Sequence, residues 1–151
     1  MPAVERSGPA RLLLGGEILP SMVGVIPFEL AHSEGVARVC AAEGWPSWTT
    51  ETVAAAFSAP GVLALVAYDR GEVVGAAQLL TDGSVMAYLG LLVVAAEARG
   101  AGIGRSLIRE LFSRSGFERM DLLSEDGSTG FYDSLPHKTK PGYRLYGESF
   151  G

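Results

Sequence analysis

A glycine-rich stretch with an arginine at each end is the part of this sequence best suited to chemistry. It reads Arg99-Gly100-Ala101-Gly102-Ile103-Gly104-Arg105. Glycines let the backbone turn tightly and approach a ligand closely, and the N–H groups at a helix start attract phosphate. Arginine side chains can pair with the same oxyanions. The stretch therefore predicts a diphosphate site, with a glycine-rich connection whose arginines are only solvated as the open alternative.

The elements on either side place this stretch between a strand and a helix. An uncharged apolar run, 85–96, ends just before it and predicts a buried strand. After it, apolar side chains recur at helical spacing from Ile103 to Phe112, and Gly116 is placed to end the helix. The predicted diphosphate site thus lies at the N-terminus of a helix that follows a strand.

The rest of the pattern predicts a mixed α and β domain. The other expected elements are a strand at 22–27, helices at 33–43 and 53–58, strands at 62–68 and 73–80, a strand at 117–123, a helix at 128–135 and a strand at 138–146. Ser33 is the expected N-cap of the first helix, and Thr49 or Thr50 that of the second. Residues 1–20 are interpreted as an irregular N-terminal extension and 21–151 as a single domain.

Two other phosphate-binding motifs are excluded by spacing. In a P-loop the glycines would be one residue further apart than Gly100 and Gly104, and lysine would replace Arg105. A dinucleotide fingerprint would need glycine at position 105 or 107. The pattern that fits is [QR]-x-x-G-x-[GA], which Arg99, Gly102 and Gly104 satisfy.

With this pattern, Leu92-Val93-Val94 before it and Phe131-Tyr132 after it, the chain resembles the GNAT superfamily of acyl-CoA N-acyltransferases. The likeness extends from about residue 22 to 146. It implies an α+β fold with a GNAT-like mixed, mostly antiparallel central sheet of about six or seven strands and about four flanking helices. It also implies an N-acetyltransferase with acetyl-CoA as cosubstrate and direct transfer to a primary amine of a small molecule or peptide.

The resemblance assigns roles to residues on both sides of the turn. The residues expected to bind acetyl-CoA through their backbone are Leu92, Val93 and Val94 for the pantetheine arm, and Arg99, Gly100, Ala101, Gly102, Ile103, Gly104 and Arg105 for the diphosphate. A splayed or bulged strand leaves an N–H near Val94 free to serve as an oxyanion donor to the thioester carbonyl. Tyr132 is the expected general acid, and packing of an aromatic pair with Phe131 is the open alternative.

Two features keep a second class of function open. Where the family commonly has Gly-Phe after this tyrosine, the chain has Leu135-Pro136-His137. In addition, no residue is marked as a general base, since solvated helix charges explain Glu29, Glu43 and Glu51. The alternative is a non-catalytic acyl-CoA-binding sensor or partner module. Trp45 and Trp48 either wall the acceptor site or anchor the helices around them.

Composition and charge exclude several classes of partner. The chain has 151 residues and a net charge of -5, which disfavours nucleic acid, and no apolar run approaches the roughly 20 residues of a membrane helix. Basic residues gather after residue 98, where a polyanionic ligand would bind. His32 and His137 are isolated, so no metal site is expected, and Cys40 is interpreted as buried. We expect a cytoplasmic protein, and its sheet edges are compatible with a homodimer.

Overall fold

The structure, a computed structural model, describes residues 11–12, 18–19 and 23–151. The chain divides into two compact units, Met1–Asp121 and Leu122–Gly151. Most of the predicted extension 1–20 lies outside the described residues. Within it, β1 (Arg11–Leu12) and β2 (Ile18–Leu19) form an antiparallel pair. The assignment of 21–151 to a single domain stays a prediction.

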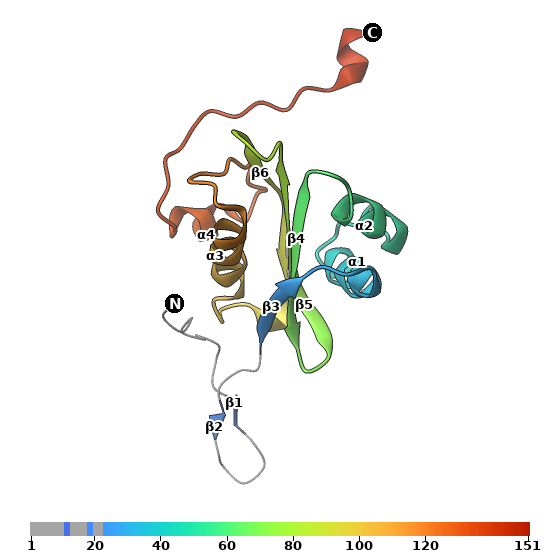
Figure 1. Cartoon of the computed structure of the whole chain (residues 1–151), viewed down its shortest axis with the longest axis vertical. Coiled ribbons are helices and arrows are strands. Elements are labelled where there is room, and N and C mark those ends of the chain that lie inside the picture. The colour runs from blue at the N-terminus through green and yellow to red at the C-terminus, as the bar shows by residue number, and fades with distance from the viewer. Residues whose placement is uncertain (1–10, 13–17, 20–22) are drawn as a thin grey trace. The chain divides into compact units, whose positions relative to one another are not determined.

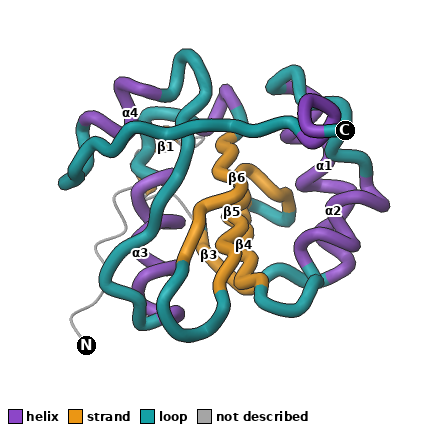
Figure 2. Tube along the Cα trace, turned by 90° about the horizontal axis from the view of Figure 1, so that it is seen from above, coloured by secondary structure: helices purple, strands orange, loops and turns teal. Residues whose placement is uncertain are grey.

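The main sheet of the first unit has four antiparallel strands. In sheet order they are β3 (Gly24–Pro27), β4 (Val62–Asp69), β5 (Glu72–Thr81) and β6 (Ala87–Val94). Two helices, α1 (Ser33–Ala42) and α2 (Thr50–Phe57), cover one face, and α3 (Ile103–Ser115) covers the other (Figures 1 and 2). Because both faces are covered, β4 and β5 are apolar runs without polar alternation.

Each face of the sheet has its own buried side chains. Those under α1 and α2 include Val36, Val39, Cys40, Val53, Phe57, Val66, Ala76, Leu91 and Val93. On the other face, α3 contributes the buried side chains of Ile103, Leu107 and Leu111. The helical spacing of apolar residues after residue 102 therefore correctly predicted the helix and its buried side.

Helix starts follow the expectation in one case and not in the other. The Thr49 hydroxyl accepts the N–H of Thr52 at 3.2 Å and caps α2, as predicted. Ser33 is not the N-cap of α1, because a 3-10 helix, η1 (Leu30–His32), runs directly into the helix and His32 takes that position. Ser33 is instead the first helical residue, and its side chain is buried.

A β-bulge at Gly90 divides β6 into two parts. Leu89 lies opposite Leu79 and Leu91 opposite Gln78, so Gly90 is an extra residue in the register. The bulge reverses the faces, because the buried residues after it join the core under α1 and α2 and the buried residues before it do not. A Cβ at Gly90 would lie 2.7 Å from Gln78 Oε1, so the Gln78 side chain would have to shift to admit one.

After α3 the chain returns to the start of β6. Asp121 forms an isolated parallel bridge with Tyr88: the Leu89 N–H donates to the Asp121 carbonyl at 2.9 Å, and the Asp121 N–H donates to the Ala87 carbonyl at 3.0 Å. The helix α3 is thus a crossover between two parallel neighbours, β6 and the short segment at Asp121. The strand predicted at 117–123 is wrong, since it is reduced to this single bridge.

The second unit contains α4 (Thr129–Asp133) and a 3-10 helix, η3 (Gly147–Phe150). The predicted helix at 128–135 is thus confirmed, but the strand predicted at 138–146 is wrong. Tyr143 and Leu145, which suggested it by their alternation, are 84% and 76% exposed, and among the described residues no strand pairs with this segment. The central sheet described here therefore has four strands rather than six or seven, while the four expected α-helices are present.

Candidate functional site

The far half of β6 presents backbone groups along the edge that faces away from β5. The Ala95 N–H donates to the Val74 carbonyl at 2.8 Å, so these two residues form a hydrogen-bonded pair. Because backbone groups alternate along antiparallel strands, those of Val93 also face β5, and those of Leu92 and Val94 face away from it. The three residues predicted to bind pantetheine are therefore not equivalent.

This outward edge is paired only at its start. Asp121 bonds beside Tyr88, and beyond the bulge no backbone hydrogen bond from the described residues reaches Leu92 or Val94 on that side. The edge is open because of the bulge at Gly90 and because the chain after α3 pairs with β6 only at Asp121. The resemblance implied an open edge at this place. An extended ligand with amide groups could bind there as an added strand would.

The glycine turn that follows exposes the N-terminus of α3. Gly100 and Gly102 have φ values of +79° and +78°, in the left-handed region that favours glycine, and Gly102 is the N-cap. The first helical hydrogen bond runs from the Ser106 N–H to the Gly102 carbonyl at 2.9 Å. The N–H groups of Gly102, Ile103 and Gly104 therefore have no partner within the helix, which suits an anion.

The side chain of Arg99 contacts protein groups and is not free to point at a phosphate. Its N–H donates to the Ala96 carbonyl at 3.3 Å, and its Nε donates to the Val94 carbonyl at 3.2 Å. Its Nη2 forms an ion pair with Oε1 of Glu43, the C-cap residue of α1. Glu43, one of the carboxylates considered as a base, is thus engaged by Arg99, while Arg105 lies exposed in the first turn of α3.

Tyr132 lies on α4, in the second unit. Its ring meets that of Phe131 edge to face, with 5.0 Å between centroids, as the packing interpretation expects. Burial raises the pKa of Tyr132 above its ordinary value of about 10, so the hydroxyl remains protonated at neutral pH. A general acid must hold its proton until the leaving group departs, and this environment meets that requirement. The catalytic role of Tyr132 stays a prediction.

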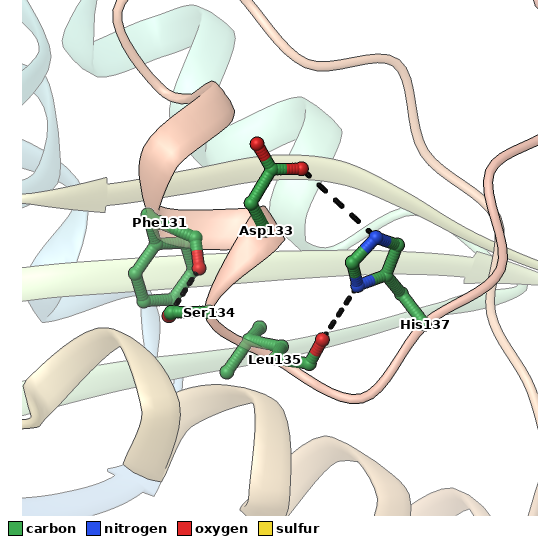
Figure 3. Close-up of polar contacts among 5 residues, drawn as sticks. All are labelled: Phe131, Asp133, Ser134, Leu135 and His137. Carbon is green, nitrogen blue, oxygen red and sulfur yellow. Dashed lines mark hydrogen bonds and ion pairs between the residues drawn. The ribbon is translucent and has the colours of Figure 1, made fainter.

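Short-range hydrogen bonds hold the segment that follows Tyr132 (Figure 3). The Ser134 hydroxyl donates to the Phe131 carbonyl at 2.5 Å, and His137 Nδ1 donates to the Leu135 carbonyl at 2.6 Å. His137 Nε2 lies 3.9 Å from Oδ1 of Asp133, an ion pair only when the imidazole is protonated. These contacts order the residues that stand where the family commonly has Gly-Phe.

Several residues considered for chemistry have structural roles. Cys40 is fully buried, and that burial, together with the Glu43 charge, raises the pKa of its thiol to about 11, which makes it a poor nucleophile. Trp45 and Trp48 are partly buried against the core under α1 and α2, as anchors of these helices would be. Within the described part of the chain, no three metal-ligating side chains form a group. No described helix is long and apolar enough to cross a membrane.

Two contributors to this region were not predicted. Gln78 is buried in β5 opposite Leu91, and its Nε2 donates to the Ala56 carbonyl of α2 at 3.2 Å, beside the bulge. A single glutamine within the apolar run 73–80 was the signal that could have found it. The pairing of Arg99 with Glu43 joins segments far apart in the sequence, and no local pattern marks it.

Comparison with known proteins connects this geometry to a family. The model of the acetyltransferase (GNAT) domain matches residues 60–135, which make up half of the chain and contain β4 to α4. No curated protein matches the sequence. The chain belongs to the GNAT acetyltransferase family.

Solved structures share the fold at low sequence identity. An acetyltransferase from Trypanosoma brucei is 21% identical with a TM-score of 0.65, covering 82% of this chain and 99% of that one. An aminoglycoside acetyltransferase from an uncultured soil metagenomic sample is 17% identical, with a TM-score of 0.67 and coverages of 82% and 97%. A ribosomal-protein-alanine N-acetyltransferase from Brucella melitensis is 15% identical, with a TM-score of 0.66 and coverages of 82% and 98%. At these identities the likeness shows the fold alone.

Proposed function

We propose that this chain is an N-acetyltransferase that transfers the acetyl group of acetyl-CoA directly to a primary amine of a small molecule or peptide. The observation that carries the proposal is the continuity between the open edge of β6 and the N–H groups at the start of α3. In CoA the amide-containing pantetheine arm is likewise joined directly to the diphosphate, so the arm matches the edge of β6 and the diphosphate matches the start of α3. Family membership supports the acetyl-transfer chemistry.

Each part of the site has a separate task in this proposal. The N–H groups of Gly102, Ile103 and Gly104 would bind the diphosphate, with Gly100, Ala101 and Arg105 around them. Leu92 and Val94 would bond to the amides of the pantetheine arm, with Val93 holding the strand in the sheet. An N–H near Val94 would stabilise the charge that develops on the thioester oxygen, a contribution of about 3 kcal/mol to the barrier.

Proton transfer completes the proposed reaction. When bound, acetyl-CoA supplies the thioester whose carbonyl carbon the amine attacks while the C–S bond breaks. The Tyr132 hydroxyl would give its proton to the departing sulfur, and the proton lost by the attacking amine would go to water. The buried Cys40 thiol supports direct transfer rather than an acyl-enzyme. A cytoplasmic location and a homodimer also stay predictions.

Two measurements on the purified protein test the proposal. Calorimetry should show CoA binding, and incubation with acetyl-CoA and a panel of amines should release free thiol only when a suitable amine is present. Mass spectrometry should find the acetyl group on that amine. CoA binding without amine-dependent thiol release would identify a sensor or partner module instead, and absence of CoA binding would contradict both.

A further inference from the structure

One side chain connects three elements around the proposed donor site. Arg99 stands between the end of β6 and the glycine turn, bonds to the Val94 carbonyl through Nε, and pairs with Glu43 through Nη2. Glu43 is the residue at which α1 ends. The strand edge and the turn are therefore both attached, through this side chain, to the end of a helix whose inner side packs in the core.

The positive charge of Arg99 is already paired with the carboxylate of Glu43. An ion pair lowers the attraction that its guanidinium exerts on a further anion, because the two charges largely cancel at a distance. Two of its donor nitrogens already have acceptors in the protein. This arrangement favours a supporting role for Arg99 over direct binding of a phosphate.

The glycine turn needs such support. Gly100 and Gly102 give the turn its left-handed conformations, but glycines also have the largest backbone freedom to lose when a ligand orders them. A turn that is already held in its binding conformation loses less entropy on binding. The bond from Arg99 to Val94 also fixes the last peptide of β6, whose N–H at Ala95 bonds to β5.

We propose that Arg99 and Glu43 are a positioning pair for the acyl-CoA donor, which holds the glycine turn in register with the open edge of β6. This inference rests on the proposed function, since it concerns the same site. Neither side chain needs to touch the reacting atoms. The pair acts through the backbone groups of the turn and of Val94.

The pair and a direct phosphate contact predict opposite results for one substitution. If the pair positions the turn, Glu43→Gln weakens CoA binding because it releases Arg99. If Arg99 binds phosphate directly, Glu43→Gln removes a competing carboxylate, and CoA binding stays the same or becomes tighter. Arg99→Gln weakens binding in both cases and so cannot separate them alone.

The experiment measures the dissociation constant of CoA by calorimetry for wild type, Glu43→Gln, Arg99→Gln and the double variant at low ionic strength. We expect each single variant to bind about tenfold more weakly, as loss of one charged hydrogen-bonded contact allows, and the double variant to be no weaker than the singles. The matched control is Glu110→Gln, which breaks the Arg114–Glu110 ion pair on α3 and should leave binding unchanged.

A kinetic measurement separates positioning from a general loss of structure. The KM for acetyl-CoA should rise about tenfold in Glu43→Gln, while kcat stays within about twofold, since the variant disturbs donor binding and not the chemistry. The KM for acetylpantetheine, which lacks the diphosphate and would depend on the pair only through Val94, should rise clearly less than that for acetyl-CoA. Equal losses with both donors would contradict the proposal, as would unchanged or tighter CoA binding by Glu43→Gln. Failure of wild type to bind CoA would instead contradict the proposed function itself.

Discussion

The two units of the molecule differ in how deeply their side chains are buried. In the first, Leu65, Val66 and Leu79 are completely buried in β4 and β5, and the proposed donor groups are backbone groups fixed by this sheet. In residues 122–151 every residue is exposed or only partly buried, and α4 has five residues. We infer that the proposed donor binding depends on a rigid framework, whereas the proposed role of Tyr132 depends on a less buried unit. Substitutions in the two regions should therefore act on different steps.

The largest effect is expected in the glycine turn. Gly102→Val places a side chain where the diphosphate is proposed to approach the backbone and should weaken CoA binding at least about 100-fold. Gly116→Val is the matched control, because Gly116 also has a left-handed backbone, with φ +73°, but lies at the other end of α3. Both variants carry the same backbone strain, so calorimetry should find loss of CoA binding only in Gly102→Val. Equal CoA affinities of the two variants would show that the glycine turn does not bind CoA.

The next largest effect concerns the second unit. Tyr132→Phe should lower kcat by about 10² or more with little change in the KM for acetyl-CoA, because a general acid acts on the chemical step. Tyr143→Phe, at an 84% exposed position of the same unit, should leave both constants unchanged. Since the pKa of Tyr132 is raised, wild-type kcat should persist up to about pH 10 and fall only above it. An unchanged kcat in Tyr132→Phe would show that Tyr132 only packs against Phe131 and is not the general acid.

A third prediction tests the framework at the bulge. Gly90→Ala introduces a Cβ 2.5 Å from Leu80 Cδ1 and 2.7 Å from Gln78 Oε1, and overpacking of this kind should cost up to about 3 kcal/mol of unfolding free energy. Gly24→Ala in β3 meets nothing within 4 Å and serves as the control in urea unfolding. If Gly90→Ala is as stable as Gly24→Ala, the side chains of Leu80 and Gln78 move aside without cost and the bulge does not require glycine at this position.

The smallest prediction concerns the core under α1. The folded pKa of Cys40 is about 11 against an ordinary value of 9.0, so the unfolded chain loses this proton first as the pH rises. Stability should therefore decline between about pH 9 and 11, by about 2 kcal/mol at pH 11, where each unit of pKa difference contributes about 1.4 kcal/mol. Cys40→Ala should lack this part of the decline when urea unfolding is followed across that range. An identical pH dependence in both proteins would show that Cys40 is not buried.

The elements that the sequence predicted well are those with long local patterns. The helix after residue 102 has thirteen residues and repeats its apolar side from Ile103 to Phe112, and β4 and β5 are apolar runs joined by a tight turn. The strand expected at 138–146 rested on a short alternation, and a strand also requires a partner that local sequence does not reveal. Ser33 failed as a cap because η1 extends the helical turn backwards and is capped by Glu29, whose N–H donates to His32 Nδ1 at 2.9 Å.

The candidate site shows the same division. The turn before α3 was predictable because glycines at fixed spacing mark a tight turn, and Gly100 and Gly102 have left-handed backbones there; its role in phosphate binding stays a prediction. The side-chain reversal at Gly90 and the ion pair between Arg99 and Glu43 were not predictable, because each depends on segments that meet only in the folded chain. The local shape of a turn can thus be predicted from spacing, while the long-range contacts around it cannot.

Amide hydrogen exchange by NMR, with and without CoA, tests the central claim most directly. The account predicts that CoA slows exchange at least about tenfold at Leu92 and Val94 and at Gly102, Ile103 and Gly104, where N–H groups would gain acceptors. Val93, whose N–H faces β5, should change much less and serves as the internal control. Exchange that CoA leaves unchanged at Leu92, Val94 and the turn would contradict the account.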